Sequence, residues 1–94
     1  MSYYTYILLC SDDSYYVGIT NNIENRFKQH CNGYVENSYT YARRPLKLVY
    51  YEKCQYVINA IAREKQLKGW SRKKKEALIN KFPDELKVLA KKIF

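Results

Sequence analysis

Residues 3–20, YYTYILLCSDDSYYVGIT, decide how the fold begins. Tyr3–Cys10 is aromatic and aliphatic and lacks the polar face of a helix, and Tyr15–Thr20 is a second run of the same kind, so both are predicted to be β-strands. Between them, Ser11–Ser14 consists of short polar side chains that hydrogen-bond their own backbone in turns. The stretch therefore predicts a β-hairpin.

The chain after this hairpin predicts a helix, a loop and a third strand. The helix follows an Asn-Asn N-cap and ends at Gly33, with apolar residues every four positions, at Ile23, Phe27 and Cys31. Residues 34–45 show no sustained period and are predicted to be a loop. Leu46–Glu52 is rich in β-branched and aromatic residues and follows a proline, which is typical of a strand.

Three further helices complete the prediction. The first runs from about Gln55 to Lys68, and the second opens at Ser71 and ends before Pro83. The last, over about 84–93, has an apolar stripe of Leu86, Leu89, Ala90 and Ile93. The order ββαβααα predicts a single α+β domain over residues 1–94, with a small, three-stranded, mainly antiparallel sheet flanked by helices.

Composition narrows the class of protein. The chain has 94 residues, 47% of them hydrophobic, with only 3 Gly and 2 Pro, which excludes disorder as the main state. Its apolar runs are too short to span a bilayer and its N-terminus does not resemble a secretory signal, so we expect a cytoplasmic protein with no membrane partner. The net charge is +8, and residues 48–94 contribute +7 of it. This asymmetry favours a polyanion partner such as nucleic acid, the alternative being a solvated, lysine-rich helical surface.

The cysteines and the single histidine do not predict a zinc site. Cys10, Cys31 and Cys54 are widely spaced, and His30 is directly adjacent to Cys31. Neighbouring side chains on a helix point about 100° apart and therefore chelate poorly. We expect three reduced thiols that pack as small apolar groups.

Glu64 stands out because it falls within the predicted apolar face of its helix. The apolar residues around it are Val57, Ala60, Ile61 and Leu67. An unpaired carboxylate is costly to bury, so Glu64 is expected to pair with an arginine from elsewhere in the fold or to hold a divalent metal ion. A third reading places it at the edge of the stripe, where it extends into solvent.

Two further pairs lie at the border between core and solvent. Arg26 and His30 are four residues apart and so share one face of the first helix. Arginine suits bidentate binding of phosphate, and histidine can transfer a proton. Tyr6 and Tyr16 lie on the two hairpin strands, within a few residues of cross-strand register. Each pair alone is more often an ordinary exposed helix face or ordinary sheet packing than part of a functional site.

Taken together, these residues resemble the GIY-YIG nuclease superfamily. Tyr4-Thr5-Tyr6 stands where that family has G-I-Y, and Tyr16-Val17-Gly18 stands where it has Y-I-G. The positions of Arg26, His30 and Glu64 also correspond, although Tyr4 replaces the family glycine and an additional asparagine of some phage-type members has no match. Residues 1 to about 80, including a close counterpart of 63–72, are similar to the small stand-alone bacterial members.

The resemblance implies a single-metal phosphodiesterase site. In it, Tyr6 would act as the base that activates water, and Arg26 would clamp the scissile phosphate. Glu64 would hold one Mg²⁺ or Mn²⁺, while Tyr16 and His30 would orient water or phosphate. Because an unperturbed tyrosine titrates near ~10, neighbouring cations would have to lower the pKa of Tyr6.

Other residues are candidates for contacts to the nucleic-acid backbone. Gly18 has no Cβ and would let a phosphate approach closely. The remaining candidates are basic and would bind independently of base sequence: Arg43, Arg44, Lys68, Arg72, Lys73, Lys74 and Lys75. We expect an endonuclease acting on DNA with structure-directed or weak sequence preference, at branches, flaps or damaged sites as in DNA repair. The alternative is a non-catalytic nucleic-acid-binding accessory module. The sequence leaves DNA against RNA and the oligomeric state open.

Overall fold

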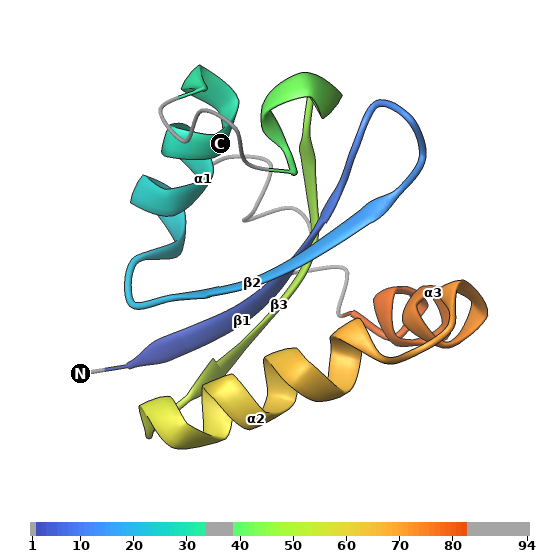
Figure 1. The fold of residues 1–94 in the computed structure, drawn as a ribbon. Coiled ribbons are helices and arrows are strands. Elements are labelled where there is room, and N and C mark those ends of the chain that lie inside the picture. Colours follow the sequence, from blue (N-terminus) through green and yellow to red (C-terminus); the bar gives the residue numbers. More distant parts are fainter. Residues whose placement is uncertain (1, 34–38, 83–94) are drawn as a thin grey trace.

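The computed structural model of the chain describes residues 2–33 and 39–82 (Figure 1). Three antiparallel strands form one sheet in the order β2-β1-β3. Their bounds are Tyr3–Leu9 for β1, Tyr15–Thr20 for β2 and Lys47–Cys54 for β3. The fold is α+β, the strands and helices up to residue 82 follow the predicted order, and the hairpin prediction is confirmed within one residue at each end.

The central strand β1 supplies the core on both faces of the sheet, as expected for a strand with alternating side chains. Tyr6 and Leu8 pack with Phe27 on one face. Ile7 packs on the other face, in a cluster that includes Leu67. Figure 1 shows α1 (Ile23–Asn32) on one side of the sheet and α2 (Val57–Lys68) with α3 (Arg72–Asn80) on the opposite side. The sheet thus lies between two helical layers.

Helix α1 begins and ends where its capping residues predict. The side chain of Asn22 accepts from the backbone N–H of Asn25 at 3.0 Å, and Gly33 ends the helix at φ = 72°. The predicted buried stripe is partly wrong, however. Cys31 is exposed, and the buried residues of α1 are Phe27 and His30.

The cysteine prediction is also corrected. All three thiols are free, but only Cys10 is buried, whereas Cys54 is half-buried and Cys31 exposed. The helix is rotated so that a histidine occupies the core position expected for a small thiol. A buried imidazole is tolerated only when its polar atoms have partners, which His30 has.

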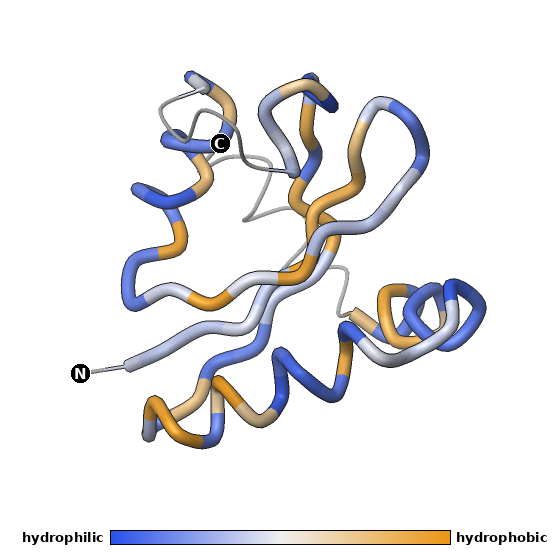
Figure 2. The backbone as a smooth tube through the Cα atoms, in the orientation of Figure 1, coloured by the Kyte–Doolittle hydropathy of each residue, from blue (hydrophilic) through white to orange (hydrophobic). Residues whose placement is uncertain are grey.

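The buried face of α2 differs from the predicted one. Ala60 and Leu67 are fully buried, but Val57 and Ile61 are 42% and 38% exposed. Ile58 is 71% exposed, and Figure 2 shows the resulting hydrophobic start of this helix. Only one edge of the apolar stripe contacts the sheet, because the first turn of α2 extends past the core.

The remaining predictions agree closely with the structure. Ser71 caps α3 by accepting from the N–H of Lys74. The described part of the loop predicted over 34–45, residues 39–45, includes the 3₁₀ turn Tyr41–Arg43. The last predicted helix, over about 84–93, lies outside the described residues. Within the described ranges, no helix is long and apolar enough to cross a membrane.

Candidate active site

A chain of buried hydrogen bonds links the sheet to α1 and to the segment before β3. The hydroxyl of Tyr6 lies 2.8 Å from Nε2 of His30. The other ring nitrogen of His30, Nδ1, lies 2.9 Å from Oγ1 of Thr40. Tyr6 is 2% exposed, and His30 and Thr40 are each 1% exposed. Both ring nitrogens therefore have hydrogen-bond partners and are shielded from bulk solvent.

Burial changes the acid–base properties of this phenol–imidazole pair. It lowers the pKa of His30 from 6.5 to about 4, and the charge of Arg26 acts in the same direction. Burial also raises the pKa of Tyr6 to about 12, with smaller contributions from Tyr16 and Glu64, whereas hydrogen bonding and charge from Arg26 oppose this rise. Both groups are neutral at pH 7. The expectation that cations lower the pKa of Tyr6 below its usual value is wrong for the protein without substrate.

Gly18 on the edge strand β2 gives the Tyr6 phenol its space. A Cβ at this position would lie 2.5 Å from the Tyr6 hydroxyl oxygen and 3.0 Å from Cε2 of Tyr16. The phenol therefore lies directly across the backbone of residue 18, where any larger residue would displace it. Packing of Tyr6 accounts for this glycine, and a phosphate contact at Gly18 stays a prediction.

Tyr16 extends the aromatic cluster from the core toward the surface. Its ring centroid lies 6.3 Å from that of Tyr6 and 5.3 Å from the ring of His30. On the outer side it is nearly parallel to Tyr39, with an interplanar angle of 23° and a centroid separation of 6.2 Å. The two strand tyrosines are thus on one face of the hairpin, as the cross-strand register predicts.

Helix α1 places Arg26 one turn before His30. Arg26 is half-buried, and its Nη1 donates to Oε1 of Gln29 at 3.3 Å. Its charge acts on Tyr6 and on His30, as their pKa values show. The helix therefore presents a guanidinium at the border of the site and an imidazole inside it.

Glu64 reaches the same region from α2, on the other side of the edge strand. Its side chain is 21% exposed, and Oε1 lies 3.3 Å from Nζ of Lys68. Its negative charge contributes to the raised pKa of Tyr6, so the carboxylate lies near the phenol. Within the described part of the chain, Glu64 pairs with a lysine one turn further on and with no arginine.

The carboxylate of Glu64 is the type of ligand that a hard divalent cation prefers. Among residues 2–33 and 39–82, no three side chains of His, Cys, Asp or Glu gather as a multi-ligand metal site. Mg²⁺ in phosphoryl-transfer sites is commonly held by one or two carboxylates, with water and substrate oxygens completing its shell. A partly exposed carboxylate fits this type of site. His30 does not contribute, because Tyr6 and Thr40 occupy both of its ring nitrogens.

The two arginines predicted to contact nucleic acid near β3 are held against tyrosines. Arg43 donates from Nε to Asp12 at 3.0 Å, and its guanidinium lies 3.8 Å from the centroid of Tyr39. Arg44 lies 4.7 Å from the centroid of Tyr41. These contacts orient both guanidinium groups, and Tyr39 places that of Arg43 at the outer end of the aromatic cluster.

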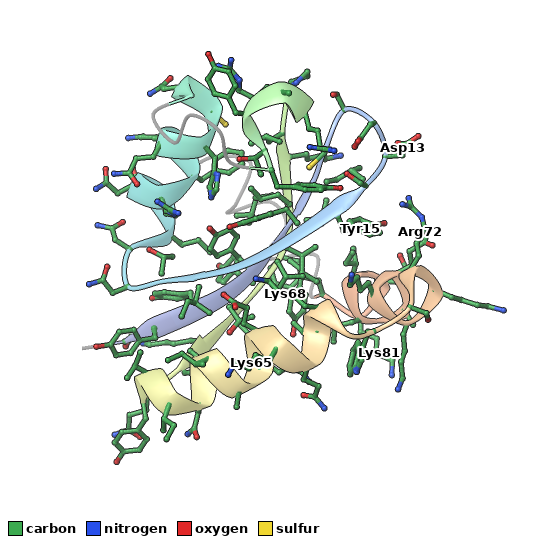
Figure 3. The ribbon with its side chains drawn as sticks, in the orientation of Figure 1. Asp13, Tyr15, Lys65, Lys68, Arg72 and Lys81 are labelled. Atoms are coloured by element: carbon green, nitrogen blue, oxygen red, sulfur yellow. The ribbon has the colours of Figure 1, made fainter. Side chains whose placement is uncertain are left out.

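The basic residues of α2 and α3 form a second group. Arg72 lies over Tyr15 at 4.6 Å and donates to the backbone oxygen of Asp13, which joins α3 to the hairpin turn (Figure 3). Figure 3 also shows Lys68 on the side of α2 toward β2. The remaining basic residues of this group lie on α3, where Lys73 and Lys74 are exposed and Lys75 is half-buried.

Three residues of the site are not predicted from the sequence. Thr40 and Tyr39 lie in the aperiodic stretch after α1, and Gln29 faces Arg26 within that helix. Their roles depend on contacts between segments that only the tertiary structure brings together. The tyrosine-rich composition of 34–45 was the one available indication.

The chain belongs to the GIY-YIG family. The family profile described as the GIY-YIG catalytic domain matches residues 2–77, and this domain is a nuclease fold in general. The sequence-based resemblance is therefore confirmed.

Similar proteins belong to a group of small bacterial and archaeal chains. The UPF0213 protein of Syntrophus aciditrophicus (strain SB) is 42% identical over 83 residues, covering 88% of this chain and 95% of the relative. The UPF0213 protein CPE1444 of Clostridium perfringens is 46% identical over 77 residues, covering 82% of each. The solution NMR structure of a UPF0213 protein from Bacillus halodurans, 38% identical, superposes with a TM-score of 0.56 and covers 85% of this chain and 84% of that one. These names state no activity.

Proposed function

We propose that this protein is a divalent-metal-dependent endonuclease that hydrolyses phosphodiester bonds in DNA, with structure-directed or weak sequence preference. The observation that carries the proposal is the buried bond between Tyr6 and His30, with Arg26 and Glu64 both acting on the same phenol. A surface that only binds nucleic acid has no need to bury a phenol–imidazole pair beside a cation and a carboxylate.

Water activation begins at Tyr6. As a water molecule attacks the phosphorus atom, its proton passes to the Tyr6 oxygen while the phenol proton passes to Nε2 of His30. This transfer needs the neutral imidazole with its proton on Nδ1, donated to Thr40 at 2.9 Å. The low pKa of His30 keeps Nε2 unprotonated at pH 7 and able to accept. The relay avoids a free phenolate, which the raised pKa of Tyr6 disfavours.

Arg26 binds the scissile phosphate and stabilises the charge that develops on its oxygens. Binding of phosphate to Arg26 also makes His30 a stronger base. Arg26 lowers the pKa of His30, so a phosphate that neutralises the guanidinium removes this effect and favours proton uptake at Nε2. Tyr16, next to both rings, orients the attacking water or the phosphate through its hydroxyl.

Glu64 is the residue that would hold one Mg²⁺ or Mn²⁺. A bound divalent ion supplies charge neutralisation beside the departing oxygen. The partner of Glu64, Lys68, is 53% exposed and on a flexible side chain, so it can leave the carboxylate at little cost. The exposed lysines of α3 supply sequence-independent attraction to the phosphate backbone.

The test is cleavage of a panel of labelled single-stranded, duplex, flap and junction DNA, and of matching RNA, with Mg²⁺, Mn²⁺ or chelator. We expect cleavage of DNA that requires the metal and is lost in Tyr6→Phe. Tyr56→Phe is the matched control, since this tyrosine is 59% exposed at the start of α2. Binding without cleavage under every condition would favour the accessory-module alternative.

A further inference from the structure

Beside the catalytic residues of the proposed reaction lies an open pocket of about 280 Å³. It lies between the start of β2, the segment before β3 and the lysine-bearing helices. Apart from Val17, its lining is aromatic or basic: Tyr15, Tyr16, Tyr39, Lys68 and Lys75. Tyr16 belongs both to this pocket and to the cluster around Tyr6 and His30, so the two sites are adjacent.

Tyr39 gives the pocket a flat, partly exposed aromatic wall. It is 42% exposed and nearly parallel to Tyr16. Their centroids are 6.2 Å apart, so the rings are not in direct face-to-face contact and leave ring surface uncovered. The guanidinium of Arg43 lies 3.8 Å from the Tyr39 centroid, and Arg43 also pairs with Asp12. These contacts hold the ring in place without burying it.

The opposite side of the pocket carries positive charge. Lys68 reaches it from α2 and Lys75 from α3, and no acidic side chain lines it within the described residues. Figure 3 shows Lys68 between α2 and the sheet, on the same side of the molecule as Tyr15. Planar aromatic surface combined with ammonium groups is the arrangement that binds a nucleobase and its phosphate in single-stranded nucleic acid.

We propose that this pocket binds the unpaired nucleotide that flanks the scissile phosphate, with the base against Tyr39 and Tyr16 and the backbone phosphate on Lys68 and Lys75. The proposal rests on the proposed function and adds a substrate requirement to it. A base inside a duplex is covered on both faces by its neighbours and cannot stack on a protein ring without leaving the helix. The preferred substrate is therefore unpaired at the position next to the cut.

Binding measured without cleavage tests this subsite separately from the nuclease activity. Oligonucleotides with one 2-aminopurine, single-stranded or in a duplex, are titrated with protein in chelator. The base fluorescence reports stacking, and anisotropy of an end label reports affinity. We expect tighter binding to the single strand and quenching on binding. Tyr39→Ala should weaken single-strand binding roughly 5- to 150-fold and abolish the quenching, whereas Tyr39→Phe should retain both.

Tyr56→Ala serves as the matched control, because it removes an exposed tyrosine outside the pocket and should leave binding unchanged. Thermal melting of each variant checks that the fold is intact. Equal affinity for duplex and single strand, or unchanged quenching in Tyr39→Ala, would overturn the subsite even if the protein cleaves DNA. Binding that depends on Tyr39 in a protein that cuts no substrate would support the subsite and refute the proposed nuclease activity.

Discussion

Acidification from about pH 7.5 to about pH 5 tests the protonation state of His30. The folded chain lowers the pKa of this residue from 6.5 to about 4, so between these values the unfolded chain binds one proton more than the folded chain. The stabilisation that comes from keeping His30 neutral is therefore complete above the pKa of the unfolded chain, 6.5, and is lost as the pH falls toward the folded-state pKa of about 4. The free energy of unfolding should decrease by about 2 kcal/mol at pH 5, out of roughly 3 kcal/mol available at lower pH.

Urea unfolding at several pH values measures the decrease in the free energy of unfolding. A decrease of about 2 kcal/mol should lower the melting temperature by roughly 8 to 16 °C. His30 is the only histidine of the chain, so few other groups titrate in this window. His30→Gln is the control: its stability at pH 7.5 will differ, but its slope between about pH 7.5 and 5 should be nearly flat. A wild-type protein with pH-independent stability, or an NMR titration of His30 with a pKa near 6.5, would refute the buried neutral imidazole.

Three other changes probe the remaining parts of the site. Tyr6→Phe should abolish cleavage and lower the free energy of unfolding by about 1–3 kcal/mol in urea titrations, because it leaves Nε2 of His30 buried without its partner. Glu64→Gln should abolish metal-dependent cleavage yet change stability by only about 0.5 kcal/mol, since its one cationic partner in the described residues, Lys68, is 53% exposed; a loss of several kcal/mol on melting would contradict this placement. Charge reversal at 73–75 should weaken binding about equally for different sequences and flatten its salt dependence, as measured by anisotropy.

Much of the fold could be predicted because local patterns decide it. The hairpin strands alternate between two buried faces, and the turn between them consists of residues that hydrogen-bond their own backbone. Asn22 and Gly33 determine where α1 begins and ends. In each case the residues that determine the element lie within it or a few positions from it, so the element can be predicted from the sequence.

The errors concern which side of a helix faces the core. His30 replaces Cys31 in the interior because Tyr6 and Thr40 satisfy both ring nitrogens, and those partners are 24 and 10 residues away in the sequence. Val57 was predicted to be buried on hydrophobicity alone, but the first turn of α2 passes beyond the sheet. Which residues of a helix are buried depends on tertiary contacts, and the apolar pattern of one helix does not show these contacts.

Arg26 connects these observations to the proposed chemistry. Without substrate, its charge opposes protonation of His30 while it favours ionisation of Tyr6, but burial outweighs the second effect and the phenol stays protonated. In the proposed mechanism, substrate acts on the imidazole rather than on the phenol, by changing the charge of Arg26. A bound phosphate does this directly: it neutralises the guanidinium and makes Nε2 a better proton acceptor. Burial of the imidazole persists, so the gain is partial and the relay depends on phosphate bound at Arg26. In the proposed mechanism, the residue that would bind the scissile phosphate would thereby also make His30 a better base.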